Sequence, residues 1–173
     1  MVDSVSPSLR PGVPGNIDAC VALWVDACAV RDGRAFNGVA ERARPKFDRR
    51  VVWLVAGGAR RVNGFALATA PGTGLPTDPS DAAVLGLLAV DPNLQTRGLG
   101  RALLHATSRQ LRRARYEQAV LHALPDNRTA VALYESEGWV AVGDPSDHSL
   151  LRRPMQTFTL DLRADFLSAT EQN

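Results

Sequence analysis

Apolar residues recur at helical spacing in the first third of the chain, at Ile17, Cys20, Val21, Trp24 and Cys28. This stripe predicts a helix from Ile17 to about Val30, with Asn16 as its N-cap. A second, weaker helix is expected over Val39–Phe47, with a stop or kink near Pro45. Ahead of both helices, Val5–Leu9 is expected to form a short edge strand.

Blocks of apolar, β-branched residues dominate the rest of the chain. Val51–Ala56 and Val62–Ala70 flank a glycine-containing connection and predict a hairpin. Pro71–Asp81 is rich in Pro, Gly, Thr and Asp and predicts a loop long enough to have a role. Further strands are expected at Ala82–Val90, Gln118–Leu124, Trp139–Val142 and Met155–Leu162, and further helices at Leu99–Ala114 and Asn127–Ser136.

Size and charge limit the classes of function. A chain of 173 residues, 45% of them apolar, fits a single α/β domain over residues 1–173. The formal net charge of +2 is too even to indicate nucleic acid as the main partner. A nucleic-acid binder nevertheless stays open as an alternative, because arginines cluster late in one expected helix, at Arg109, Arg112, Arg113 and Arg115.

The two cysteines and the apolar runs indicate a cytoplasmic protein. Cys20 and Cys28 would lie about 12 Å apart along one helix, which is too far for a disulfide. Without histidines nearby they form no zinc site, so we expect no metal and a reducing compartment. The first 14 residues lack the apolar core of a secretory signal, and no run approaches the roughly 18 apolar residues of a membrane span.

The most informative segment leads from the strand expected at Ala82–Val90 into a helix. The strand ends at Asp91, and a short loop with Gln95, Gly98 and Gly100 opens directly into the helix. Amide groups at a helix start are unpaired, and the helix dipole favours anions there. Because the glycines lack Cβ, a large anion can touch the main chain, so the segment predicts a diphosphate site.

Three kinds of diphosphate site must be distinguished. A Walker loop needs Gly-Lys-Ser/Thr, which is absent. A dinucleotide-binding fold needs a third Gly where Leu103 stands, and an acidic residue about 20 positions later, where Ala123 stands. The third pattern, Gln/Arg-x-x-Gly-x-Gly/Ala after a strand, is met by Gln95-x-x-Gly98-x-Gly100. A glycine-containing turn that binds nothing is the alternative to all three.

Two motifs resemble the GNAT-type N-acetyltransferase superfamily. Residues 84–104 are similar to its coenzyme A motif. Its Asn-x-x-Ala-x-x-x-Tyr-x-x-x-Gly-Phe segment is matched, with Trp in place of Phe, by Asn127, Ala130, Tyr134, Gly138 and Trp139. The resemblance implies a mixed, mostly antiparallel sheet of about six or seven strands, splayed between strands 4 and 5 and flanked by about four helices. The coenzyme-binding core would cover residues 82–142.

The resemblance also implies how acetyl-CoA would bind, without a metal. The pantetheine arm would pair with the main chain of Leu88 and Val90 in the gap between the splayed strands, and Asn127 would steady it. The diphosphate would lie on the amides from Thr96 to Arg101. The implied cofactor-binding residues are Leu88, Ala89, Val90, Gln95, Thr96, Arg97, Gly98, Leu99, Gly100, Arg101, Asn127 and Tyr134.

Tyr134 and His122 are the catalytic candidates. In relatives, the tyrosine matching Tyr134 protects or protonates the leaving sulfur; packing in the core is the alternative role. Several relatives carry a basic or acidic side chain where Val84 and Gly86 stand, and neither of these can take a proton. Other relatives use a Glu twelve residues before the tyrosine, where His122 stands. An imidazole can accept a proton near neutral pH. A strand histidine that is paired to the main chain or faces solvent is the alternative role for His122.

The resemblance implies transfer of the acetyl group to a primary amine of a small molecule or peptide by direct attack. The acceptor would lie between the first two helices and the loops Pro71–Asp81 and Ser146–Pro154. Side chains on that side are Arg31, Arg34, Phe36, Asn37, Arg152 and Arg153, whose arginines indicate either an acidic acceptor or a solvated face. A non-catalytic acyl-CoA sensor or structural subunit is the alternative, and relatives often pair as homodimers.

Overall fold

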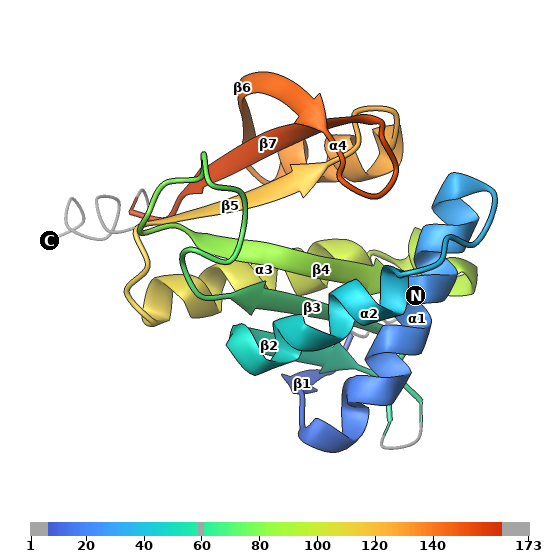
Figure 1. Cartoon of the computed structure of the whole chain (residues 1–173). Helices are drawn as coiled ribbons and strands as arrows, with labels where there is room; N and C mark the ends of the chain where they lie inside the picture. The colour runs from blue at the N-terminus through green and yellow to red at the C-terminus, as the bar shows by residue number, and fades with distance from the viewer. Residues whose placement is uncertain (1–6, 59–60, 164–173) are drawn as a thin grey trace, which may run out of the picture.

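A seven-stranded sheet runs through the protein in a computed structural model that describes residues 7–58 and 61–163, without the side chains of 95–97 (Figure 1). The strands are β1 Leu9–Pro11, β2 Arg50–Ala56, β3 Gly64–Thr69, β4 Ala83–Val90, β5 Gln118–Ala123, β6 Val140–Asp147 and β7 Pro154–Asp161. The helices are α1 Ile17–Asp32, α2 Val39–Ala43, α3 Leu99–Arg113 and α4 Arg128–Ser136, with 3-10 turns η1 Pro14–Asn16, η2 Arg44–Arg49 and η3 Pro92–Arg97. In this part of the chain no helix is both long and apolar enough to cross a bilayer.

The strand order is β1-β2-β3-β4-β5-β7-β6, and every neighbouring pair is antiparallel except β4 and β5. These two parallel strands are in register only at Ala83 with Ala119 and Val84 with Val120. Beyond this short seam they diverge (Figure 1). The predicted fold, a mixed and mostly antiparallel sheet splayed between strands 4 and 5 with four helices, is confirmed.

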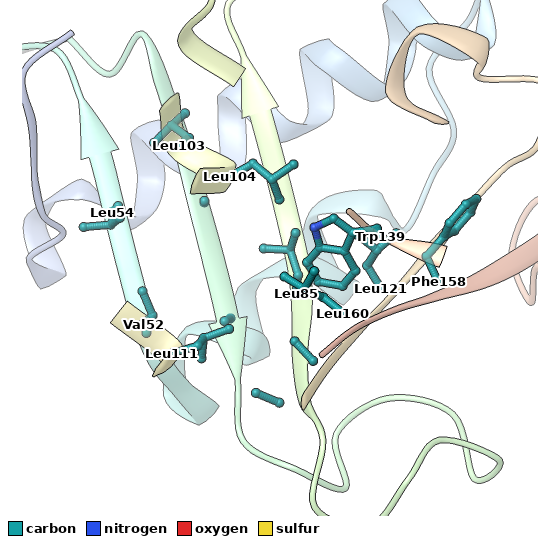
Figure 2. Close-up of a cluster of buried hydrophobic side chains, with 14 of the residues drawn as sticks. Val52, Leu54, Leu85, Leu103, Leu104, Leu111, Leu121, Trp139, Phe158 and Leu160 are labelled. Atoms are coloured by element: carbon teal, nitrogen blue, oxygen red, sulfur yellow. The ribbon is translucent and has the colours of Figure 1, made fainter. Parts of the chain in front are cut away.

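The sheet is covered on both faces because its strands alternate. On β2, Val52 and Leu54 belong to the cluster under α3, whereas Trp53 and Val55 pack on the side of α1. Figure 2 shows leucines of α3 above the sheet, and all three labelled ones are almost fully buried: Leu103, Leu104 and Leu111. Each such side chain contributes about 1.5–3 kcal/mol to stability, so packing holds α3 and the segment that precedes it in place.

The N-terminal edge differs from the expectation. The edge strand is Leu9–Pro11 instead of Val5–Leu9, whose first two residues lie outside the described part of the chain. Asn16 precedes α1 but is no capping side chain: its Oδ1 accepts hydrogen bonds from the Val13 amide at 3.1 Å and from Arg10 Nη1 at 3.0 Å. The side-chain oxygen of Asn16 is thus bonded to residues that precede the helix. The 3-10 turn η1 lies in the segment where a turn was expected.

Two other elements have unexpected bounds. The helix expected over Val39–Phe47 ends at Ala43 and continues as η2, with Pro45 near its start, because proline interrupts α-helical hydrogen bonding. Strand β6 extends beyond Val142 to Asp147, so it takes in the start of the loop expected at Ser146–Pro154. Gly143, at a φ of +68°, lies within the register shift that permits this extension.

Candidate functional site

The candidate site lies where β4 and β5 diverge. Pairing with β5 ends at Val84, so Leu88, Ala89 and Val90 lie on the half of β4 that has β3 on one side and, among the described residues, no strand partner on the other. The main-chain N–H and C=O groups along this free edge resemble those of an edge strand, which can pair with an extended ligand.

A β-bulge deforms β4 in the same region. Leu67 of β3 pairs with Leu87, but the next residue, Ala68, pairs with Leu85, so Gly86 is the extra residue on β4. Bulges of this kind redirect side chains and main-chain groups beside functional sites. Here Lys46 Nζ donates a hydrogen bond to the Gly86 carbonyl at 3.3 Å.

Gly98 forms the junction between η3 and α3. Its φ of +73° is left-handed, a conformation that glycine adopts at little cost. The Ala102 amide donates to the Gly98 carbonyl at 3.1 Å, which is the first bond of the helix. The amides of Leu99, Gly100 and Arg101 come before that bond, so they have no partner within the helix and suit an anion.

Asp91 fixes the turn before this junction. Its Oδ1 accepts from the Asn93 amide at 3.0 Å, and its Oδ2 accepts from Arg61 Nη2 at 2.9 Å. These bonds, the Asn93 amide first, hold the pKa of Asp91 below its usual value. The main chain of Gln95, Thr96 and Arg97 follows in η3, but their side chains lie outside the described part, so their contacts with a diphosphate stay predictions.

The side chain of Arg101 is directed at α4. It forms an ion pair with Glu137, which follows directly after α4, and His105 Nδ1 lies 3.7 Å from the other oxygen of that carboxylate. This contact ties the start of α3 to the end of α4. The Arg101 amide is available at the helix start, but its guanidinium charge is shared with Glu137.

Asn127 is the N-cap of α4 and Tyr134 lies within this helix, which Figure 1 shows beside the end of β5 that diverges from β4. Asn127 occupies the N-cap position, but its side chain makes no capping hydrogen bond. The side-chain amide of Asn127 is therefore not used by the helix. The Tyr134 ring packs 6.5 Å from Trp139 and 6.2 Å from Phe158, centroid to centroid. Burial raises the pKa of Tyr134 to about 12, against a smaller opposing effect of Arg31, so its phenol keeps its proton at neutral pH.

His122 pairs with an aspartate that the sequence did not single out as its partner. Its Nε2 lies 2.9 Å from Asp78 Oδ1, and the Asp78 Oδ2 accepts from the Leu75 amide at 2.7 Å. The His122 side chain is 14% exposed and that of Asp78 6%. Both alternatives considered for this histidine, pairing to the main chain and facing solvent, are therefore wrong. The loop expected at Pro71–Asp81 is anchored on β5 by this contact.

The expected acceptor elements converge at the ends of α1 and α2. Arg31 binds Asp32 through two hydrogen bonds of 2.7 Å, and Arg153 bonds to Asp32 at 3.2 Å and to Asp126. Arg42 Nη1 donates to Ser149 Oγ at 2.9 Å. These contacts join the end of α1 and the end of α2 to the connection between β6 and β7. Arg34 instead lies 4.3 Å from the ring centre of Phe36, and the acceptor-side assignment stays a prediction.

A sequence model described as the acetyltransferase (GNAT) family matches residues 24–139, well over half of the chain. The chain belongs to the GNAT acetyltransferase family. The resemblance seen in its motifs is therefore confirmed, and the matched range includes the Gly98 junction, His122 and Tyr134.

Curated relatives of this GNAT protein match over short segments. A mycothiol acetyltransferase from Geodermatophilus obscurus is 36% identical over 98 residues, which are 56% of this chain and 31% of that protein. A ribosomal protein bS18-alanine N-acetyltransferase from Escherichia coli K12 is 42% identical over 59 residues, 34% of this chain and 40% of that protein. The matches thus span less than half the length of either relative.

Solved structures agree over nearly the whole fold. The ribosomal-protein-S18-alanine N-acetyltransferase of Escherichia coli superimposes with a TM-score of 0.70 over 91% of this chain and 94% of that one, at 21% identity. A Salmonella typhimurium protein solved with its cofactor acetyl-CoA gives a TM-score of 0.68 at 18% identity, over 91% and 94% of the two chains. At these identities the likeness is one of fold.

Proposed function

We propose that this GNAT protein transfers the acetyl group of acetyl-CoA to a primary amine of a small molecule or a peptide. The observation that supports the proposal is that the start of α3, the end of β4 and α4 lie together: a Cβ at Gly100 would lie 3.6 Å from Leu133 Cδ2 and 3.7 Å from Val90 Cγ2. These elements offer amides without a partner in the helix, a strand edge that β5 leaves beyond Val84, and the protonated phenol of Tyr134. Acetyl-CoA supplies a thioester already activated for attack by an amine.

The described residues fit this cosubstrate. The amides of Leu99, Gly100 and Arg101 would hold the diphosphate, and main-chain groups of Leu88 and Val90 would hold the pantetheine arm. A Cβ at Gly98 would meet nothing within 4 Å, so the junction is open there, whereas a Cβ at Gly100 would be in ordinary contact with Leu133 and Val90 at 3.6 and 3.7 Å. Asn127 would bind the arm with an amide that α4 does not use.

Two side chains are proposed to move protons. The Tyr134 phenol, whose pKa of about 12 keeps it protonated, donates to the sulfur as it leaves. The His122 imidazole takes a proton from the amine, directly or through water, and Asp78 orients the ring. Val84 and Gly86 have no group that can serve as base.

The acceptor amine must be neutral to attack. A lysine amine has a pKa of about 10.4 in water, so at pH 7 the neutral form costs about 4.6 kcal/mol. For an α-amine of pKa about 7.8 the same cost is only about 1 kcal/mol. A single imidazole as base therefore favours α-amines or other weakly basic amines as acceptors.

Location and assembly belong to the same proposal. Cys20 and Cys28 are free and buried, which fits a reducing compartment, so we place the protein in the cytoplasm. We propose neither a nucleic-acid nor a membrane partner, and pairing as a homodimer stays a prediction.

The decisive experiment measures acetyl-CoA binding by calorimetry and then free thiol release with a panel of amines. Amine-dependent thiol release, with acetylated amine found by mass spectrometry, is the expected result. Tight binding of acetyl-CoA without turnover on any amine would favour the sensor alternative, which the uncharged Val84 and Gly86 already suggest. Absence of acetyl-CoA binding would overturn the proposal.

A further inference from the structure

Lys46 lies at the bulge of β4, and Arg42 contacts Ser149 in the connection between β6 and β7, which is expected to border the acceptor. We propose that these two side chains bind an oxyanion of the acceptor, so that the acceptor is an amine that also carries a carboxylate or a phosphate. This inference rests on the proposed function, because it concerns the second substrate of the same site.

Lys46 is placed by the bulge. A Cβ added at Gly86 would lie 3.4 Å from Lys46 Cδ and 3.7 Å from Nζ, so the lysine occupies the space that a side chain at position 86 would enter. Its ammonium donates to the Gly86 carbonyl at 3.3 Å. The carbonyl uses one of the ammonium donors, and the others can face the half of β4 that has no partner toward β5.

The positive charge of the two side chains is not balanced within the described part of the chain. Asp32, whose side chain is 1% exposed, is taken up by Arg31 and Arg153, and Asp126 also binds Arg153. Among residues 7–58 and 61–163, no carboxylate lies within ion-pair distance of Lys46 or Arg42.

A partly buried cation without a counter-ion is costly, and a bound anion would relieve that cost. Burial, and then the charge of Arg42, lower the pKa of Lys46. The same positive field reaches His148, whose pKa is lowered by burial first and then by Arg31 and Arg42. Two elements, η2 and the connection after β6, thus share an electropositive environment.

The same charges act on the amine end of the acceptor. A cation near an amine disfavours its ammonium form, so the reactive neutral form is favoured in this site. Acceptors with several ammonium groups and no anion would be repelled. Lys46 and Arg42 therefore select for an acceptor in which an oxyanion accompanies a single amine.

The test compares matched acceptors that differ in one anionic group. The probes are the dipeptide Ala-Ala against its C-terminal amide, and O-phosphoethanolamine against ethanolamine, at saturating acetyl-CoA. In the wild type, kcat/KM should favour the anionic member of at least one pair about tenfold or more, since hydrogen bonds between charged groups are strong. The pair that responds identifies carboxylate or phosphate as the group bound.

Lys46→Met and Arg42→Gln should each bring that ratio close to one, because the rate with the anionic member falls more than the rate with the neutral member. Lys46→Arg should restore the preference. Arg44→Gln is the matched control, because Arg44 lies in the same segment but pairs with Asp18 at 2.8 Å, and it should leave the ratio unchanged.

Two outcomes would overturn the inference and leave the proposed function intact. One is wild-type turnover with no preference for either anionic probe; the other is an equal loss with anionic and neutral members in Lys46→Met. If acetyl-CoA binds but none of the amines is acetylated, both the inference and the proposed function are overturned.

Discussion

His122 and Asp78 are 44 positions apart in the sequence, yet His122 Nε2 lies 2.9 Å from Asp78 Oδ1. The contact joins the loop after β3 to β5, just beyond the seam where β4 and β5 pair. A carboxylate in this position fixes the ring and its tautomer, as in other histidines that exchange protons. The His122–Asp78 pair therefore gives the proposed base a defined orientation.

Asp78→Asn should lower kcat about 10–100-fold, with little change in the KM for acetyl-CoA, because the imidazole loses its orienting charge. Steady-state kinetics measures both constants. Asp81→Asn is the control: Asp81 lies on the same loop and accepts from Gln118 Nε2 at 2.7 Å, away from the histidine.

His122→Ala should in addition flatten the acid limb of the pH–rate profile. An unchanged profile would show that His122 is not the base.

Tyr134→Phe should lower kcat about 100-fold or more and leave the affinity for acetyl-CoA nearly unchanged, since only the hydroxyl is lost. Kinetics and calorimetry report the two quantities separately. A parallel loss of both would indicate that the ring acts in packing against Trp139 and Phe158. Absorbance at high pH should also show a phenol titrating near pH 12 that disappears in the variant.

Gly98→Ala should destabilise the protein by about 1 kcal/mol, because its φ of +73° is strained for any other residue, and should weaken acetyl-CoA binding about tenfold or more. Chemical denaturation and calorimetry measure the two effects. Gly143→Ala has a similar φ of +68° in β6, so it should cost similar stability without affecting binding. Equal affinity in the two variants would contradict an anion site at Gly98.

Acidification should destabilise the protein through His148. Burial lowers the pKa of this side chain, and its Nδ1 accepts from the amides of Leu150 and Leu151 at 3.2 and 3.1 Å. As pH falls through about 6.5, the unfolded chain takes up a proton that the folded protein binds less readily, so the free energy of unfolding decreases. His148→Asn should make this pH dependence shallower, because an amide oxygen can accept the same bonds without titrating. Denaturation at pH 8 and at pH 5.5 gives the free energy of unfolding at each pH. An equal change between these two pH values in the wild type and in His148→Asn would refute this role.

The fold was predictable because its strands and helices have clear periods. Val51–Ala56 is apolar throughout, as is typical of a strand that is buried on both faces, and its side chains do divide between the two core clusters. The motif around Gly98 is likewise local, since a turn, two glycines and a helix start are contiguous in sequence.

Features that depend on contacts distant in sequence could not be predicted. The Gly86 bulge arises from pairing with β3, and it is this bulge that gives Lys46 its hydrogen bond. Asn16 satisfies Arg10 and Val13 in place of a helix amide because β1 brings that chain segment close. His122 pairs with Asp78, which lies 44 positions earlier in the sequence. No pattern within a single element encodes such pairs.

The short seam between β4 and β5 also bears on how the molecule responds to heat. Only two residue pairs join these strands, although the whole C-terminal part of the sheet is attached there. A ligand bound along the free edge of β4 would join the part of the sheet before this seam to the part after it. Binding of this ligand should raise the melting temperature progressively with ligand concentration, as mass action requires when only the folded form binds.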